Sequence, residues 1–329
     1  MELLFTGTSS GAPTKTRNVT GLALKMSHGK SWYLVDCGEG TQHRILHLPL
    51  SLATLKAIFI THVHGDHCYG LPGLLGAASL NGRRAPLQII GPPEIEAWLN
   101  ATRSLTQLHL TFDLNFTPVA DGEICWQDQN LAVQALPLSH RATCHAYAFT
   151  EQNIEPRLDL TKLQTAGIAP GPFCGLLRQG QNVTLADGRT LLAQDFLLPP
   201  AAPRKVIIGG DNDNPGLLLE AAQDAQVLVH EATYTEAMAL KVGPGPRHSH
   251  ARAVAQMAQQ AGLPNLILTH FSARYQDMTN YPPSIKDIAD EAAASYQGHL
   301  FLARDFDHFQ LDSHDHLTQL ARSTPQASL

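Results

Sequence analysis

Short apolar runs recur along the chain, and several of them end in a histidine or an acidic residue. The first, Leu55–Ile60, leads to His62. Four later runs, Leu131–Leu138, Val206–Ile208, Val227–Val229 and Leu266–Leu268, lead to His140, Asp211, His230–Glu231 and His270. Apolar runs of this length are typical of buried strands. We therefore predict neighbouring strands that deliver polar side chains to one edge of a sheet pair.

Stretches with helical character separate many of these runs. They cover Pro92–Leu105, Pro215–Ala225, His248–Ala261 and Ser284–Tyr296. Three more apolar segments open the chain and are predicted to be strands, at Glu2–Gly7, Thr20–Met26 and Ser31–Cys37. This mixture predicts an α/β sandwich with its functional site at the strand ends.

The densest group of potential metal ligands is the motif Thr61–His67, with sequence THVHGDH. It follows the first of the strand-like runs and precedes Gly70–Leu75, which predicts a helix with Pro72 in its first turn. Side chains alternate in an extended loop, so His62 and His64 can share one metal ion, and Asp66 and His67 can reach a second. Crowding these groups is costly unless a cation lies between them, so the motif predicts a metal site.

The periodic pattern weakens between Glu151 and Arg189, where Thr165–Gly175 is rich in glycine and proline. A long stretch without regular structure inside a compact domain is usually functional or mobile. We predict an arm at about residues 151–189, inserted in one domain of residues 1–311, with a polar tail at 312–329. An ordinary variable surface insertion is the alternative.

Composition limits the function classes. Of the 329 residues, 43% are hydrophobic and 16% are charged, which allows a sizeable core. The five cysteines are odd in number and form no CxxC pair, which argues against a disulfide framework or a thiolate zinc site. The net charge of −6 does not favour a nucleic-acid binder, although bound cations would offset part of it locally. No apolar run is long enough to span a bilayer and no signal peptide precedes the first strand, so we expect a cytoplasmic protein.

The motif Thr61–His67 and its Gly70–Leu75 continuation resemble the metallo-β-lactamase superfamily. The Gly70–Gly73 part of this continuation and the segment Gly167–Gly175 together narrow the resemblance to the short form of ribonuclease Z, a family that makes the 3′ ends of tRNA. The resemblance also includes His230–Thr233 and Thr269–Tyr275. The resemblance implies a metallo-β-lactamase-like αβ/βα four-layer sandwich with an inserted, projecting arm. It also implies a homodimer, in which the arm of one subunit presents tRNA to the site of the other.

Carried over by position, the resemblance implies two Zn²⁺ ions per subunit, with Mn²⁺ or another divalent ion as the alternative. The expected ligands are His62, His64 and His140 for the first ion, Asp66, His67 and His270 for the second, and Asp211 as the bridge. The expected catalytic residues are Asp66 as general base and Glu231 with His248 as the proton-donor pair. The expected substrate-binding residues are Gly167, Pro170, Gly171, Pro172 and Arg178 in the arm, together with Arg274.

These residues suit the hydrolysis of an RNA phosphodiester. Two metal ions can activate water and stabilise the charge that develops on phosphate, while a histidine paired with a glutamate can protonate the leaving oxygen. The implied function is a zinc-dependent endoribonuclease that cleaves precursor tRNA at its 3′ end by two-metal hydrolysis. It would leave a 3′-hydroxyl on the tRNA and a 5′-phosphate on the 3′ trailer.

Two other functions stay open. One is a zinc phosphodiesterase of the same fold that acts on small or cyclic phosphodiesters, and the other is a metal-free RNA-binding or scaffold homologue. Single assignments also have rivals, since His145 competes with His140 and His250 with His248. Finally, Asn212 and His250 depart from the family pattern, which usually has threonine at both positions.

Overall fold

The computed structural model describes residues 1–27, 29–154, 156–199, 202–277 and 281–321. Its contacts divide the chain into two compact units. The main unit comprises Met1–Trp126, Val133–Phe149 and Lys205–Leu329, and the inserted unit comprises Gln127–Ala132 and Thr150–Arg204. None of the helices in the described residues has the length and apolar character needed to cross a bilayer.

The first sheet of the main unit has the strand order β19-β18-β1-β3-β4-β5-β6-β7. Strands β18, β1, β3 and β4 pair antiparallel, whereas β4, β5, β6 and β7 pair parallel. The strands are β1 (Glu2–Gly7), β3 (Gly21–Lys25), β4 (Trp32–Val35), β5 (Leu55–Phe59), β6 (Leu87–Gly91), β7 (Leu114–Pro118), β18 (His308–Leu311) and β19 (Leu317–Leu320).

The second sheet has the order β17-β15-β14-β13-β10-β9-β8, and its strands β13, β14, β15 and β17 pair in parallel. These strands are β8 (Ile124–Gln127), β9 (Leu131–Leu138), β10 (Cys144–Glu151), β13 (Lys205–Ile208), β14 (Val227–Glu231), β15 (Asn265–Thr269) and β17 (His299–Leu302). A short pair, β2 (Ser9–Ser10) with β16 (Phe271–Ser272), joins the loops that follow β1 and β15.

Aromatic side chains show that the two sheets pack face to face. Phe59 on β5 packs against Tyr147 and Phe149 on β10, with ring centroids 5.1 Å apart in both pairs. Near the other edge, Phe301 on β17 lies 5.2 Å from Phe309 on β18. Such pairs contribute about 0.5–1.5 kcal/mol each beyond the area that they bury. The interior between the sheets is therefore one continuous aromatic and aliphatic core.

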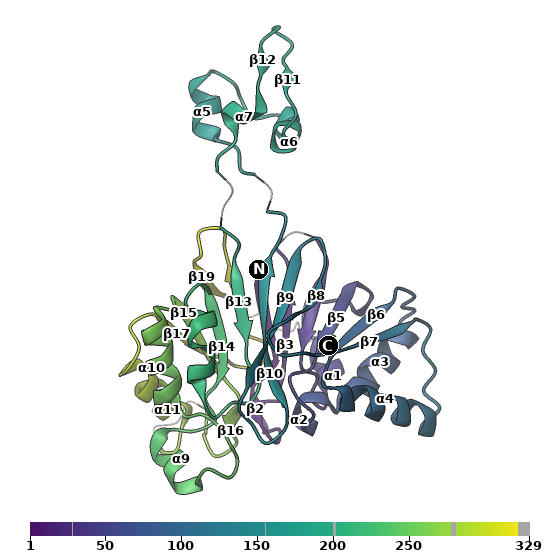
Figure 1. Cartoon of the computed structure of the whole chain (residues 1–329), viewed down its shortest axis with the longest axis vertical. Helices are drawn as coiled ribbons and strands as arrows, with labels where there is room; N and C mark the ends of the chain where they lie inside the picture. The colour runs from purple at the N-terminus through teal and green to yellow at the C-terminus, as the bar shows by residue number, and fades with distance from the viewer. Residues whose placement is uncertain (28, 155, 200–201, 278–280, 322–329) are drawn as a thin grey trace, which may run out of the picture. The chain divides into compact units, whose positions relative to one another are not determined.

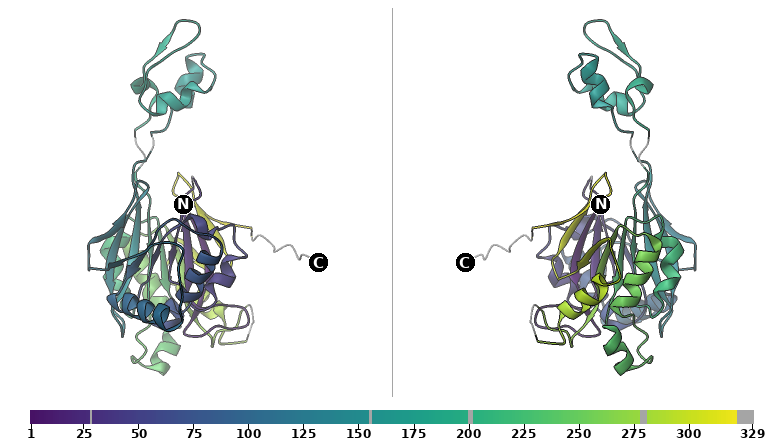
Figure 2. Two further views of the ribbon diagram at one scale, coloured as in Figure 1. Left: turned by 90° about the vertical axis from the view of Figure 1, so that its right-hand side faces the viewer. Right: turned by 90° about the vertical axis from the view of Figure 1, so that its left-hand side faces the viewer.

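Helices cover the outer face of each sheet (Figure 1 and Figure 2). The first sheet carries α1 (Thr41–Ile45), α3 (Leu71–Leu80) and α4 (Pro93–Leu105), and the second carries α8 (Leu219–Ala222), α10 (Ala251–Ala261) and α11 (Ile285–Ala293). Four short elements lie between these helices in the sequence, namely η1 (Leu52–Thr54), α2 (Gly65–Cys68), η2 (Pro215–Leu218) and α9 (Glu236–Val242). The layers run helix, sheet, sheet, helix, which confirms the predicted four-layer α/β sandwich.

The inserted unit has regular structure of its own, visible at one end of Figure 2. It contains α5 (Leu160–Thr165), α6 (Phe173–Arg178), the hairpin β11 (Val183–Thr184) and β12 (Thr190–Leu191), and α7 (Ala193–Phe196). The buried side chains of Leu163, Leu177 and Phe196 belong to its own apolar cluster. The expectation of a stretch without regular structure was wrong here, because helices of four to six residues are too short to show a helical period in the sequence.

Two other local expectations differ from the structure. Asp66 and His67 do not extend the loop but form the single-turn helix α2. Leu317–Leu320, in the expected polar tail, pairs with β18 as an edge strand, because Leu317 alternates with polar residues and is buried. The rest of the expected tail, residues 322–329, lies outside the described residues.

The local core of the inserted unit yields a testable prediction. Leu177→Ala removes a fully buried side chain, and such changes cost about 2–5 kcal/mol. Amide hydrogen exchange in α5, α6 and α7 should therefore accelerate by about 30-fold or more, while exchange in β13, β14 and β15 stays unchanged. Leu176→Ala, at the neighbouring position where the side chain is 43% exposed, is the matched control and should leave both regions unchanged. Equal exchange in Leu177→Ala and the wild type would contradict this description.

Candidate metal centre

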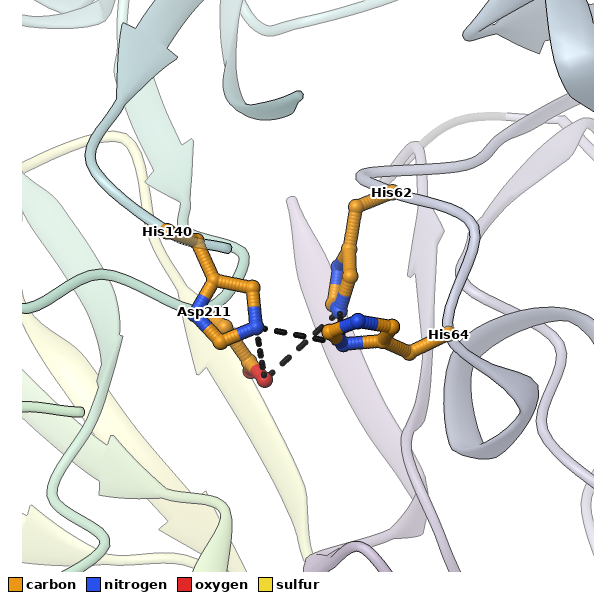
Figure 3. Close-up of side chains that lie close together, drawn as sticks. All are labelled: His62, His64, His140 and Asp211. Atoms are coloured by element: carbon orange, nitrogen blue, oxygen red, sulfur yellow. Dashed lines mark hydrogen bonds and ion pairs between the residues drawn. The ribbon is translucent and has the colours of Figure 1, made fainter. Parts of the chain in front are cut away.

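Four ligand-type side chains form a first cluster at one end of the two sheets (Figure 3). His62 and His64 come from the loop after β5, while His140 follows β9 and Asp211 follows β13. His64 Nδ1 lies 3.0 Å from His62 Nε2 and 3.1 Å from His140 Nε2. Asp211 Oδ2 lies 3.6 Å from the Nε2 atoms of His62 and His140. Three strand-end segments, far apart in sequence, thus point four side chains at one small volume.

A second cluster, formed by Asp66, His67 and His270, lies next to the first. The Nε2 atoms of His67 and His270 are 3.3 Å apart, and each lies 3.5 Å from Asp66 Oδ2. The other oxygen of Asp211, Oδ1, lies 3.4 Å from His67 Nε2 and 3.3 Å from His270 Nε2. Asp211 therefore directs one carboxylate oxygen at each cluster, which is the placement that a bridging ligand needs.

The donor set fits divalent metal ions. Asp211 Oδ1 is buried and has no hydrogen-bond partner in the protein, although buried polar atoms are normally paired. Ring nitrogens face one another at about hydrogen-bond distance in His62, His64 and His140, where neutral imidazoles would offer lone pairs. Imidazole nitrogens and carboxylate oxygens are ligands for zinc and similar ions. The two clusters can therefore hold divalent cations, one on each side of Asp211.

The electrostatics of the centre show the same need for positive charge. Burial raises the pKa of Asp211, but His270, His67 and His62 outweigh it and hold that pKa well below its usual range. Burial lowers the pKa of His67, yet the carboxylates of Asp211, Asp66 and Asp36 raise it well above the ordinary value. A proton on the His67 ring thus balances part of the carboxylate charge, a role that bound cations would take over.

Asp36 is a functional residue that the sequence analysis missed. Its Oδ2 lies 2.7 Å from His67 Nδ1, and its Oδ1 accepts the Thr61 backbone N–H at 2.8 Å. This contact occupies one ring nitrogen of His67 and leaves Nε2 facing the centre, as carboxylate partners of metal-binding histidines do. Asp36 follows the apolar run of β4, so the strand-end pattern that identified the other acids could have identified it as well.

Glu231 and His248 form a pair beside the first cluster. His248 Nδ1 lies 3.0 Å from Glu231 Oε1 and 3.7 Å from Asp211 Oδ2. Thr233 donates its hydroxyl to Glu231 Oε2 and so fixes the carboxylate. Burial lowers the pKa of His248, but Glu231 outweighs it and raises that pKa to about 9. His250 lies elsewhere, because its ring caps α10 by accepting the Ala253 N–H at 3.4 Å.

His145, the rival of His140, has other contacts, and so have the side chains of Cys68 and Arg17. His145 Nε2 lies 2.7 Å from Asp121 and takes no part in the clusters. Cys68 directs its sulfur at the Val63 carbonyl, 3.5 Å away. Arg17 is buried, pairs with Asp277 at 2.6 Å and is a structural ion pair.

The residues predicted to bind substrate lie in both units. Gly167, Pro170, Gly171, Pro172 and Arg178 belong to the inserted unit. Arg274 belongs to the main unit and lines an open groove of about 500 Å³ with Tyr234, Ser272 and the segment Ser10–Ala12. The backbone N–H of Gly11, in this groove, donates to Asp66 Oδ2 at 2.7 Å. The groove therefore adjoins the second cluster.

Comparisons with known proteins agree with this geometry. A family model described as Anti-Pycsar protein Apyc1 matches residues 1–150. A protein named Ribonuclease Z from Marinobacter nauticus is 51% identical over 95% of this chain and 97% of its own length. A second Ribonuclease Z, from Brevibacillus brevis, is 41% identical over 89% of this chain and 91% of its own length.

Solved structures share the fold. The crystal structure of human tRNase Z, short form (ELAC1), superposes with a TM-score of 0.65 at 23% identity and covers 95% of this chain and all of that one. The metallo-beta-lactamase fold protein YhfI from Bacillus subtilis gives a TM-score of 0.63 at 17% identity, over 93% of this chain and 98% of its own. Sequence identity over nearly the full length, together with this shared fold, shows that the chain belongs to the ribonuclease Z family.

Proposed function

We propose that the chain is a zinc-dependent endoribonuclease that cleaves precursor tRNA at its 3′ end. The observation that carries the proposal is the carboxylate of Asp211, which divides its oxygens between two clusters of ligand-type side chains. Five imidazoles and two carboxylates suit zinc. The full-length relatives named Ribonuclease Z support tRNA as the substrate.

Zn²⁺ bound in the two clusters would polarise the phosphate and lower the pKa of water, as in two-metal hydrolases. The chain's own residues set the geometry. Asp211 would hold the two ligand sets at a fixed spacing. Burial raises the pKa of Asp66, but His67 and His270 hold it well below its usual range, so the carboxylate stays ionised. Asp66 can then accept a hydrogen bond from the attacking water as general base.

The His248–Glu231 pair supports departure of the leaving oxygen. Glu231 accepts from His248 Nδ1, which leaves Nε2 free to donate a proton. A pKa of about 9 keeps this imidazole protonated at neutral pH. The proton would pass to the O3′ oxygen, so the products would be a 3′-hydroxyl on the tRNA and a 5′-phosphate on the trailer.

Recognition of tRNA completes the proposal. The inserted unit, with Gly167, Pro170–Pro172 and Arg178, would grip the tRNA, and Arg274 in the groove beside Asp66 would contact a phosphate of the backbone. As in the resemblance above, the enzyme would work as a homodimer in the cytoplasm. Mn²⁺ or another divalent ion is the alternative to zinc.

A second candidate is a phosphodiesterase of the same fold acting on small or cyclic diesters. The match to the Anti-Pycsar protein family model favours it, because residues 1–150 include the His62–His67 motif and His140 but end at Thr150, where the larger segment of the inserted unit begins. A small substrate would need only the metal centre. The two functions therefore differ in whether the inserted unit contributes to catalysis.

The ligand assignment predicts the metal content. His64→Ala should reduce bound metal and cut precursor tRNA cleavage by at least about 100-fold, since removing a group that supports charge stabilisation costs this much. Elemental analysis of the purified protein and cleavage of a labelled precursor, with and without chelator, measure both effects. His145→Ala is the matched control and should keep its metal, because His145 contacts Asp121 instead. Unchanged metal and cleavage in His64→Ala would refute the assignment.

The proton-donor role predicts a dependence on the leaving group. His248→Asn should slow cleavage of precursor tRNA by about 10²–10⁴-fold in kcat. The same change should have much less effect on a nitrophenyl phosphodiester, whose leaving group departs without a proton. His250→Asn serves as the control, because that ring caps α10. An equal loss on both substrates would assign His248 to metal binding instead.

The role of the inserted unit predicts a dependence on substrate size. Deleting Ile168–Arg178 removes α6 and part of the local cluster while leaving the sheets of the main unit untouched. Precursor tRNA cleavage should weaken by at least about tenfold, equivalent to ~1.4 kcal/mol of binding. Hydrolysis of the nitrophenyl diester should be unaffected. Equal losses on both substrates, with the fold intact by circular dichroism, would count against the inserted unit as a tRNA grip.

A further inference from the structure

Asn212 is a fully buried side chain next to the metal centre that belongs to neither cluster. It directly follows Asp211 and begins the loop that leads from β13 to η2. A buried amide must satisfy two donor hydrogens and the acceptor sites on its oxygen, or it destabilises the fold. The contacts of Asn212 therefore show what this amide does.

The orientation of the amide follows from its neighbours. Its Oδ1 lies 3.2 Å from the backbone nitrogens of Ser139 and Asn214. Backbone N–H groups only donate, so the atom between them must be the oxygen. The Nδ2 atom then faces His230 Nε2 at 3.1 Å, and the amide cannot be flipped without losing all three contacts.

The same logic fixes the state of His230. Its Nδ1 lies 2.7 Å from the Glu231 carbonyl oxygen, which can only accept, so Nδ1 carries the hydrogen. Its Nε2 receives the amide hydrogen of Asn212 and so bears the lone pair. His230 is thus a neutral, fully buried acceptor that holds the Asn212 amide at the end of β14.

The backbone of Asn212 also contacts the segments that carry Glu231 and His248. Its N–H donates to Glu231 Oε1 at 2.7 Å, and its carbonyl accepts the hydroxyl of Ser249, which follows His248. The next residue, Asp213, donates its N–H to the Ser139 carbonyl at 2.9 Å. Together with the Oδ1 contact, this bond clips the turn that carries His140 to the loop that carries Asp211.

We propose that Asn212 is a positioning residue that sets His140 and the Glu231–His248 pair relative to Asp211. Through one amide and one peptide it ties together four segments: the ends of β9, β13 and β14, and the loop before α10. The inference rests on the metal centre of the proposed function, but it concerns ligand geometry and not the identity of the substrate. Asn212 touches neither the cations nor the RNA, so its effect passes through the ligands that it holds.

A residue that only fills space would give a different result. Its removal would lower the stability of the metal-free protein, while the folded fraction would bind zinc normally. A positioning residue affects the metal itself. Removing a residue that orients a metal ligand typically lowers metal affinity or activity by about 10–100-fold.

The test uses the full-length chain in three variants. Asn212→Ala removes the side-chain contacts to the Ser139 N–H and to His230, and Asn212→Asp keeps an oxygen for the Ser139 N–H while losing the donor to His230. Asn214→Ala is the matched control, since that residue is an exposed asparagine two positions along whose side chain meets none of the four segments. Zinc affinity is measured by competition with a chromophoric chelator, and kcat and KM are measured separately on precursor tRNA.

We expect Asn212→Ala to bind zinc about 10–100-fold more weakly and to lose a similar factor in kcat with little change in KM. Asn212→Asp should recover most of the zinc affinity, and Asn214→Ala should match the wild type. If Asn212→Ala fails to fold, Asn212→Ser replaces it, because the serine hydroxyl stops one bond short of the Oδ1 position.

Normal zinc affinity in a folded Asn212→Ala or Asn212→Ser protein would overturn the proposal. So would an Asn212→Asp variant that binds zinc as weakly as Asn212→Ala, because an oxygen kept opposite the Ser139 N–H would then not support the zinc site. Zinc affinity does not depend on the substrate. A wild-type protein that binds zinc but does not cut tRNA would therefore refute the proposed function without touching this inference.

Discussion

The metal centre brings the lone pairs of histidine rings and the negative charges of aspartates close together in the protein interior, and the surrounding fold has to hold them there. Asp211, Asp66 and Asp36 lie against histidine rings, and Asp211 Oδ1 accepts no hydrogen bond from the described residues, although the Nε2 atoms of His67 and His270 lie 3.4 and 3.3 Å away. Burying unpaired charge costs far more than any single contact can return. The arrangement is therefore stable only with positive charge at its centre. The sheets around it must be rigid enough to hold the ligand-type side chains in place.

Parallel strands provide this rigidity. β13, β14 and β15 are adjacent and almost fully buried, so their carboxyl ends emerge at one edge with little freedom. Asp211, Glu231 and His270 follow these three ends, and β5 in the opposite sheet supplies the loop of His62 and His64. Each chemically active side chain is thus anchored by a ladder of backbone hydrogen bonds, and the loops that carry them need to be ordered over only a few residues.

Features that repeat along the sequence could be predicted, whereas a single contact between distant residues could not. The strand endings form a repeated pattern, so the α/β sandwich and the convergence of His62, His140, Asp211 and His270 were accessible from it, whereas the four layers were implied by the family resemblance. Asp36 follows β4 and shares the strand-end pattern, but its contact with His67 joins residues 31 positions apart, which that pattern does not show. The same holds for the amide of Asn212, which appeared only as a departure from a family pattern. In the inserted unit, helices of four to six residues are stabilised by a small shared cluster that no periodicity reveals.

The inserted unit leaves the second sheet after β10 and returns at β13, and these two strands are neighbours in that sheet. Because this segment leaves and rejoins the sheet at neighbouring strands, β10 and β13 can pair with each other whatever the length of the segment. Evolution can therefore lengthen, replace or delete this module without disturbing the hydrolytic chemistry.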